Sequence, residues 1–303
     1  MDMSKITPHL WFATEAVEAA HFYASVFPNT KVTEETEIKN TPSGDCDIVS
    51  FEISGQPFMA ISAGPLFKIN PSISFLVNFD PSMNEDAREL LDDVWEKLIE
   101  GGSVMMPLQP YPHSERYGWL QDKYGVSWQL MLTNPDGEPR PFIIPSLLFT
   151  QQVSGRSEEA IDFYCSVFKD SKKGMMAHYP EGAQPGMDGQ LMFGEFHAQN
   201  TWLAAMDGGP SHAFTFNEAL SLLIPCENQA DIDYYFETLS AVPEAEQCGW
   251  LKDQYGVSWQ VWPTRMGEMM SGGTPEQIER VMRSFLTMKK FDLATLERAY
   301  KGE

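Results

Sequence analysis

One thirteen-residue stretch occurs twice in this chain, and this repeat constrains the fold more than any other feature. The first copy is Gly118-Trp-Leu-Gln-Asp-Lys-Tyr-Gly-Val-Ser-Trp-Gln-Leu130, and the second is Gly249-Trp-Leu-Lys-Asp-Gln-Tyr-Gly-Val-Ser-Trp-Gln-Val261. Ten of the thirteen positions are identical, at an offset of 131 residues (249 − 118). Solenoid repeats recur roughly every 20 to 50 residues, so this much longer period predicts two homologous modules instead.

Composition narrows the class of protein. The chain has 303 residues, 43% of them hydrophobic, which is enough for two domains with substantial cores. It carries 43 acidic and 21 basic residues, a net charge of −22 at pH 7, which disfavours nucleic acid and anionic membranes as partners. No segment is typical of a secretion signal or a membrane span. The four cysteines lack C-x-x-C spacing, so we expect reduced thiols in a cytoplasmic protein: Cys46, Cys165, Cys226 and Cys248.

Hydrophobic periodicity divides the chain into a first module at 1–133, a linker at 134–141, a second module at 142–265 and a tail at 271–303. In the first module, apolar runs predict strands at 9–12, 31–38, 47–53, 57–62, 72–78, 118–121 and 126–132, and helices at 15–27 and 84–100. The second module repeats this order, with helices at 157–168 and 229–239. The proline-rich segment 102–117 is interpreted as a loop, and the matching segment 240–248 is shorter.

The tail has the pattern of an amphipathic helix. Thr274 is a good N-cap, Pro275 fits the first helical position, and Gln277 completes a capping box. Its apolar side must pack on the second module or on a partner subunit. The tail is therefore a candidate contact for a homodimer, and its apolar residues are Ile278, Val281, Met282, Phe285 and Met288.

The order of strand, helix and three strands, used twice in each module, resembles the vicinal-oxygen-chelate (glyoxalase/bleomycin-resistance) superfamily. The chain is most similar to its PhnB-like branch, several members of which carry the name 3-demethylubiquinone-9 3-methyltransferase. Besides the repeated stretch, the residues that carry the resemblance are Leu10-Trp-Phe12, Phe22-Tyr23, Gly55-Gln-Pro57, Gly64-Pro65, Gly208-Gly-Pro210, Asp233-Tyr-Tyr-Phe236 and the tail Arg280–Lys290.

The resemblance implies an α+β fold with tandem glyoxalase-like modules. Paired βαβββ units would form curved mixed sheets with the helices outside, and active sites would lie in the clefts on the concave faces. Many such sites in the superfamily are assembled across two modules, so this chain could build internally what other members build as dimers.

Superfamily enzymes hold a divalent metal with His or Glu residues, and these positions carry over one at a time. In the first module they fall on His9, near Ser72 and on Gln129, and in the second on Ser146, about Ala219 and Gln260. If sites cross modules, His9 would face Ala219 and Gln260. Neither set has two strong ligands, and a neutral glutamine lacks the charge of a carboxylate. We therefore expect no cofactor, with a divalent metal as the alternative if Glu218, His212, His197 or Asn200 reaches inward.

Three hypotheses for function remain open. The first is that an aromatic-lined cleft binds a small organic molecule, with His9 as a possible acid or base. The second is a metal-dependent lyase, isomerase or dioxygenase, and the third is a role in assembly through the tail. Methyl transfer is disfavoured because the chain has no G-x-G-x-x-G turn for a nucleotide-like cofactor. Besides His9, the candidate substrate-binding residues are Trp11, Ser127, Gln129, Met131, Ser146 and Gln260.

The repeated stretch itself is interpreted as structural. Gly125 and Gly256 are expected at positive φ in tight turns between two strands. Side chains alternate between the faces of a strand, so Trp128 and Trp259 point away from Gln129 and Gln260. We expect both indoles to pack in the core beneath the helices.

Overall fold

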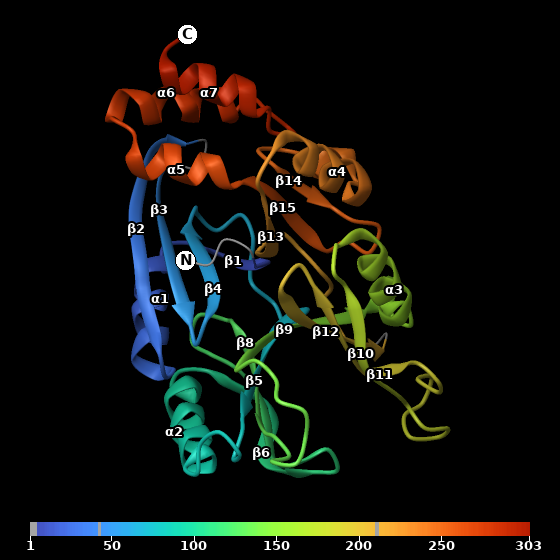
Figure 1. Ribbon diagram of the computed structural model, residues 1–303. Coiled ribbons are helices and arrows are strands. Elements are labelled where there is room, and N and C mark those ends of the chain that lie inside the picture. The colour runs from blue at the N-terminus through green and yellow to red at the C-terminus, as the bar shows by residue number, and fades with distance from the viewer. Residues whose placement is uncertain (1–4, 42–43, 210–211) are drawn as a thin grey trace.

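The computed structural model describes residues 5–41, 44–209 and 212–303. These residues form four consecutive units of strands and one helix (Figure 1). Unit 1 comprises β1 (Thr7–Phe12), α1 (Ala16–Val26), β2 (Thr30–Thr41), β3 (Gly44–Ile53) and β4 (Gln56–Ser62). Unit 2 comprises β5 (Ile73–Phe79), α2 (Ala87–Ile99), β6 (Ser103–Tyr111), β7 (Ser114–Gln121) and β8 (Ser127–Leu132).

Units 3 and 4 repeat the plan, followed by a helical tail. Unit 3 comprises β9 (Ile143–Thr150), α3 (Ser157–Val167), β10 (Lys172–His178), β11 (Leu191–Ala198) and β12 (Thr201–Gly209). Unit 4 comprises β13 (Leu220–Cys226), α4 (Gln229–Leu239), β14 (Trp250–Lys252) and β15 (Ser258–Pro263). Helix α5 (Thr264–Gly272) leads from unit 4 into the tail, which contains α6 (Pro275–Phe285) and α7 (Leu293–Lys301).

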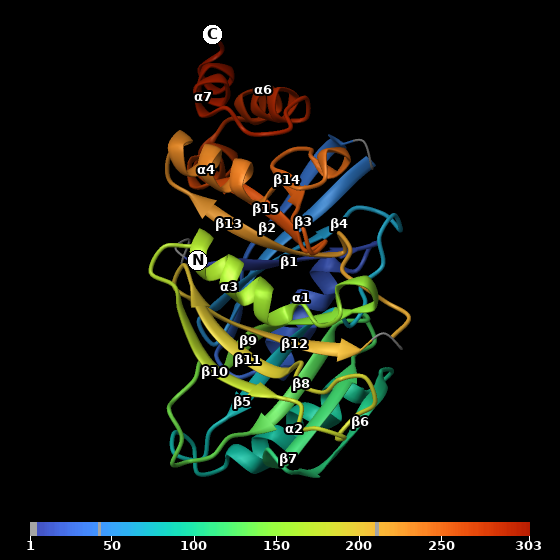
Figure 2. The same cartoon turned by 90° about the vertical axis from the view of Figure 1, so that its right-hand side faces the viewer.

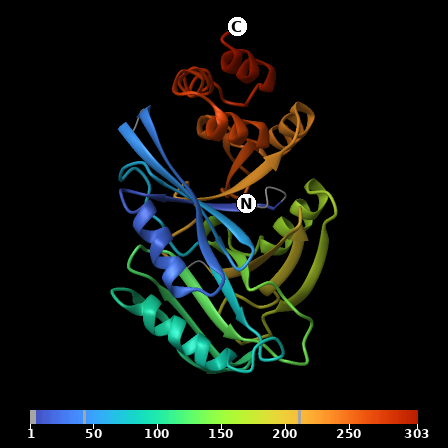
Figure 3. The ribbon, with the colours of Figure 1, turned by 60° about the vertical axis from the view of Figure 1, so that its left-hand side comes forward.

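The units pair across the modules and not within them. Sheet A has seven strands in the order β14-β15-β13-β1-β4-β3-β2, so it joins units 1 and 4. Sheet B has eight strands in the order β10-β11-β12-β9-β5-β8-β7-β6, so it joins units 2 and 3. In both sheets the first strands of the two units meet antiparallel at the centre, β1 beside β13 and β5 beside β9 (Figures 2 and 3). The predicted fold class is confirmed, and each sheet contains strands of both modules.

The proline-rich segment is a strand and not the predicted loop. Residues Ser103–Tyr111 form β6, the outermost strand of sheet B, beside β7. An edge strand pairs on one side only, so Pro107 and Pro110 need not donate to a neighbour. The pairing of β6 with β7 has several register shifts, which fits the interrupted hydrogen bonding of a proline-containing strand.

One continuous core joins the helices to one face of both sheets. Trp128 and Trp259 are fully buried in it, as the alternation of their strands predicts. Trp128 packs against Tyr23 of α1 and Phe27, with ring centroids 5.2 and 4.8 Å apart. Because α1 lies on sheet A and Trp128 belongs to sheet B, this packing ties the two sheets together.

The aspartate of the repeated stretch makes the same hydrogen bonds in both copies. Asp122 accepts hydrogen bonds from the Tyr23 hydroxyl and the Trp128 indole, each at 2.8 Å, and from the backbone N–H groups of Tyr124 and Val126. The counterpart of Tyr23 is Tyr164 of α3, which donates to Asp253 at 2.7 Å together with the indole of Trp259. Gly125 and Gly256 have φ of 84° and 86°, as predicted. The repeated stretch therefore connects a helix on one sheet to a strand of the other, twice.

The tail completes the outer edge of unit 4. Among the described residues, unit 4 has no strand that corresponds to β6. Strand β14 is therefore the edge strand of sheet A on this side. The N–H groups of Cys248 and Gly249 donate to the carbonyls of Met288 and Lys289, both at 2.8 Å. Thr274 and Gln277 form the predicted capping box at the start of α6. The tail helices lie at the end of the molecule farthest from α2 (Figure 1), and α6 ends at Phe285, before the predicted Met288.

Candidate functional site

The face of sheet B that points away from the helices and the core carries the larger of two hollows. A cavity of about 650 Å³ opens over the strands of units 2 and 3. Gln129 and Met131 of β8 line it beside Tyr117 and Trp119 of β7, while Asn134 and Arg140 of the inter-module linker lie along its rim. Its remaining apolar lining comes from Leu76, Met105, Met106, Leu148, Met175, Ala177, Met192, Phe193 and Met206. The cavity therefore draws on both modules and on the linker.

Gln129 is held rigidly in this cavity. Its Oε1 accepts a hydrogen bond from the Tyr117 hydroxyl at 2.6 Å, and its Nε2 donates to the Ser74 hydroxyl at 2.8 Å. Trp119 lies directly across from Gln129 on β7 and donates its indole N–H to Ser127 at 2.6 Å. An amide keeps one free acceptor position and one free N–H after such contacts, so Gln129 can still bind a polar group of a ligand.

Arg140 closes one side of the cavity. Its guanidinium forms an ion pair with Glu195 of β11, with Nη2 and Oε2 3.0 Å apart, and a second with Glu138 of the linker at 3.0 Å. It also lies over the Trp202 ring, 4.7 Å from the centroid. Hydrogen bonds with Glu195 are the main cause that raises the pKa of Arg140. Both charged side chains are largely buried, so this pair anchors the linker to unit 3.

An equivalent set of residues lies at the centre of sheet A. His9 pairs with Ser221, as Ser146 pairs with Ser74 in sheet B. Gln260 Nε2 donates to the Ser221 hydroxyl at 2.9 Å, matching the contact of Gln129. The residues that face His9 and Ser146 on the middle strands are thus Ser221 and Ser74. The predicted positions Ala219 and Ser72 were wrong by two residues, because the register of a central strand is set by pairing across the modules.

His9 differs from its counterpart Ser146 in chemistry and surroundings. The imidazole is 4% exposed and contacts Trp250 edge to face, with the ring centroids 5.5 Å apart. Among the residues that the structure describes, its Nδ1 has no hydrogen-bond partner, nor do the buried hydroxyls of Ser146 and Ser258. Burial lowers the pKa of His9 to about 4, so the ring is neutral at pH 7. The indole of Trp11 donates to the carbonyl of Gly64 at 2.8 Å.

Only part of the predicted site lies together. Gln129 and Met131 line the cavity. Ser127 and Ser146 belong to sheet B but do not line it, although Ser127 accepts a hydrogen bond from the lining residue Trp119. His9, Trp11 and Gln260 belong to sheet A and do not line it. Two contributions to the cavity were not predicted from the sequence. Strand β6 supplies Met105 and Met106, and the linker supplies Arg140. The only available signal for these was the apolar pair of methionines within the proline-rich segment.

The residues at the implied metal positions do not fit a divalent cation. One set is His9, Ser221 and Gln260. The other set is Ser146, Ser74 and Gln129, which contains no imidazole and no carboxylate. In each set the glutamine N–H₂ group donates a hydrogen bond to the serine hydroxyl, so the amide and the hydroxyl bind each other. Such sites usually hold the cation with imidazole nitrogens, carboxylates or thiolates. Within residues 5–41, 44–209 and 212–303, no group of three or more His, Cys, Asp and Glu side chains is placed to hold a metal ion.

Of the alternative ligands named from the sequence, Glu218, Asn200 and His197 lie elsewhere, and only His212 lies at a cavity. Glu218 forms an ion pair with Lys252 at 2.8 Å. Asn200 lies in the turn between β11 and β12 with a φ of 59°, and His197 contacts the ring of Trp202 at the end of β11. His212 lines the cavity of sheet B.

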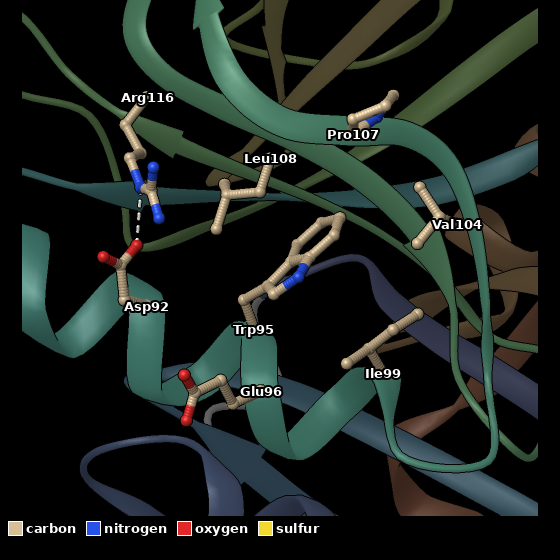
Figure 4. A pocket seen from close by; sticks show the side chains of 8 residues that line it. All are labelled: Asp92, Trp95, Glu96, Ile99, Val104, Pro107, Leu108 and Arg116. Carbon is tan, nitrogen blue, oxygen red and sulfur yellow. Dashed lines mark hydrogen bonds and ion pairs between the residues drawn. The ribbon is translucent and has the colours of Figure 1, made fainter.

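A second, shallower hollow of about 590 Å³ lies on the helix side of sheet B, between α2 and the strands β6 and β7 (Figure 4). Arg116 and Asp92 form an ion pair across it, with Nε and Oδ1 2.6 Å apart. Trp95 of α2 fills the space beside Gly118, where an added Cβ would lie 2.5 Å from the indole. This groove is therefore the packing seam of α2 on the sheet.

The family of the chain follows from comparison with known proteins. A family model described as 3-demethylubiquinone-9 3-methyltransferase matches residues 4–131 and again 141–262. The chain belongs to this family. Each module matches the family model once, so the predicted duplication of a PhnB-like module is confirmed.

Several solved structures are similar to parts or to most of the chain. A PhnB protein from Bacillus cereus is 35% identical over 43% of this chain and 99% of its own, with a TM-score of 0.38. A protein from Staphylococcus aureus is 29% identical over 44% of this chain and 100% of its own, with a TM-score of 0.18. A glyoxalase I mutant from Zea mays is 12% identical, covers 86% of this chain and 95% of its own with a TM-score of 0.50, and shares the fold. None of the curated proteins that were compared matches the chain.

No helix in the described part of the chain is both long and apolar enough to cross a membrane.

The buried imidazole predicts a pH dependence of stability. The pKa of His9 in the folded protein, about 4, lies below its ordinary value of 6.5, so the unfolded chain binds the proton more tightly. This contribution to stability is complete above pH 6.5 and is lost as the pH falls toward 4. Asp122 acts in the opposite direction, because burial raises its pKa to about 6.

The expected result is that the wild-type protein loses about 2 kcal/mol more stability than His9→Ser between pH 7 and pH 4.5. Urea denaturation at both pH values measures it. Serine is the residue at the equivalent position of sheet B, and using the same pair of pH values for both proteins cancels the contribution of Asp122. Equal losses in the two proteins would show that His9 titrates normally.

Proposed function

We propose that this protein binds a small, largely apolar organic molecule in the cavity of sheet B, and that it does so without a metal. The single observation that carries the proposal is a cavity of about 650 Å³ whose apolar walls surround the hydrogen-bonded amide of Gln129. Ligand sites of globular proteins have this volume and this mixture of apolar walls with a few fixed polar groups. The donor sets at both sheet centres support the absence of a metal, since neither contains a carboxylate.

A neutral fluorescent probe, N-phenyl-1-naphthylamine, tests the proposal. We expect its emission to rise on binding, and we expect Met131→Trp to weaken binding at least tenfold by filling the cavity. Met131 is half-buried at the cavity wall, so the larger ring can extend into empty space with little strain. Thermal melting of the variant checks that it remains folded.

The pseudo-symmetry of the chain supplies a matched control. Gln129→Leu and Gln260→Leu remove the same contact to a serine in sheet B and in sheet A. Only Gln129→Leu is expected to alter displacement of the probe by ligands that carry a hydroxyl or carbonyl group. Equal effects of both variants, or an unchanged affinity in Met131→Trp, would count against the cavity as the binding site.

His9 supports a second candidate function, acid–base chemistry at the centre of sheet A. A bound molecule can hydrogen-bond to the unpartnered nitrogen of this neutral imidazole, and the lowered pKa of about 4 makes the ring a weak base. The test is a turnover screen with wild type and His9→Gln, in which activity lost in the variant but unaffected by Met131→Trp would place chemistry at sheet A.

The methyl transfer named by the family description is not what we propose. A Rossmann-like site for such a cofactor needs a glycine-rich turn that leads from a strand into a helix, and the sequence has no G-x-G-x-x-G. Binding of S-adenosylmethionine in an equilibrium titration would reopen that function.

A further inference from the structure

We propose that the cavity of sheet B selects molecules without a negative charge, and specifically flat aromatic molecules that are uncharged or cationic. This inference rests on the proposed function and adds the chemical class of the ligand. It follows from the charges along the cavity wall and from the kind of apolar side chains that form the rest of it.

The cavity contains little positive charge that an anion could use. Among the described lining residues, Arg140 is the only arginine or lysine, whereas Asp80, Glu138, Glu195 and Asp207 are carboxylates. The guanidinium of Arg140 is already paired with Glu138 and with the buried Glu195. An anion entering the cavity would have to compete with two carboxylates for this one cation.

The buried carboxylates add to the exclusion of anions. Glu195 has a side chain that is 6% exposed, and its negative charge is paired with Arg140. Asp207 accepts hydrogen bonds from the N–H groups of Gly155, Ser157 and Leu191 and from the Ser157 hydroxyl, which fixes it at the start of α3. An anion that loses its hydration here meets two fixed negative charges, while the donors left to it are neutral amides, hydroxyls and the two histidines of the lining, His113 and His212. Such a transfer is unfavourable when the charge is not balanced.

The apolar part of the wall favours a flat ring. Six methionines line the cavity together with aromatic side chains of β7 and β11, namely Met105, Met106, Met131, Met175, Met192, Met206, Tyr117, Trp119 and Phe193. Methionine side chains are flexible and polarisable, and they contact aromatic rings favourably through sulfur. Aromatic walls add stacked or edge-to-face contacts, and they attract a cation rather than an anion.

The residual hydrogen bonding is weak and neutral. Gln129 and Tyr117 bind each other, which leaves one lone pair and one N–H of the amide for a ligand. The other uncharged polar side chains of the lining are amides and hydroxyls, namely Asn78, Thr133, Asn134, Tyr179 and Gln184. A neutral hydroxyl, carbonyl or amine can use these groups, whereas a carboxylate or phosphate would need several donors or a cation.

Two probes with the same ring skeleton test this inference. N-phenyl-1-naphthylamine is neutral, and 1-anilinonaphthalene-8-sulfonate differs from it by one sulfonate. We expect the wild-type protein at pH 7.5 to bind the neutral probe at least tenfold more tightly than the anionic one. Glu195→Gln frees the charge of Arg140, and we expect it to improve binding of the anionic probe at least fivefold with less than a twofold change for the neutral probe.

Glu138→Gln is the second variant in case loss of the buried Glu195 charge unfolds the protein. Glu138 is 70% exposed at its side chain, so the change does not threaten folding, and we expect a smaller gain for the anionic probe. Equal or tighter binding of the anionic probe to the wild-type protein overturns the inference and leaves the proposed function intact. Absence of binding of both probes overturns the proposed function, and this inference with it.

Discussion

Replacing Asp253 by alanine is expected to lower the free energy of unfolding by about 4 kcal/mol, and the same change at Asp122 should have a similar effect. Each carboxylate accepts hydrogen bonds from a tyrosine hydroxyl, an indole and two backbone N–H groups. Alanine would leave these four donors buried without partners. Burial raises the pKa of both carboxyls, and this unfavourable desolvation offsets part of what the hydrogen bonds contribute.

The effect should extend to both sheets. Tyr23 belongs to a helix on sheet A and Trp128 to a strand of sheet B, so Asp122 connects the two, and Asp253 does the same through Tyr164 and Trp259. We therefore expect one cooperative unfolding transition, shifted to lower denaturant, and not the selective loss of one module.

Chemical denaturation followed by circular dichroism measures these changes. Asp253→Asn is the intermediate case, expected to lose about 2 kcal/mol, because the amide keeps one acceptor oxygen and presents a donor to two of the four donors. Lys123→Ala is the control beside Asp122, because its ion pair with Glu18 is exposed to solvent and contributes little to stability. Variants of both aspartates within 1 kcal/mol of wild type would show that the repeated network does not hold the sheets together.

Phe291→Ala is the second large change, with an expected loss of about 3 to 4 kcal/mol. The ring is 1% exposed and packs against Gly249 of the repeated stretch, where an added Cβ would lie 2.4 Å from the ring. It also contacts Trp262, with the ring centroids 6.1 Å apart. Truncation leaves a cavity at the edge of unit 4, where the tail substitutes for the strand that β6 supplies in unit 2.

Thermal denaturation together with light scattering separates folding from association. Arg283→Ala, at a 79% exposed position of α6, is the matched control and should change stability by less than about 0.5 kcal/mol. Because the tail completes unit 4, a chain truncated before Ser271 is expected to be less stable. Its stability therefore has to be measured before a change in oligomeric state is interpreted as the loss of a dimer contact. A Phe291→Ala protein that melts like wild type would mean that the tail is dispensable for the second module.

The sequence predicted most elements correctly because their signals are local. The helix 229–239 matches α4, the capping box of Thr274 and Gln277 is present, and Gly125 and Gly256 adopt positive φ. Alternation along β8 also separated Trp128, in the core, from Gln129, at the cavity. Such features depend on residues within a few positions of each other.

The failures that affect the candidate site involve contacts between distant segments. Strand β6 was missed because prolines disfavour a strand in isolation, although an edge position tolerates them. Ser221 and Ser74 were missed by two residues because their register is set by partners in the other module. Arg140 lies in a turn-rich linker, where no local pattern indicates a role for it. Its role depends on Glu195, 55 residues later in the chain.

The repeated stretch by itself determined the duplicated module, the family and the structural role of its own tryptophans and glycines. Only the tertiary structure decided that units 1 and 4 share one sheet and units 2 and 3 the other. The physical reason is that the edge of the first strand of a unit can pair with the first strand of any other unit. The sequence of that strand does not specify which unit it pairs with. The choice of partner places the cavity beside Gln129 and places His9 on the other sheet.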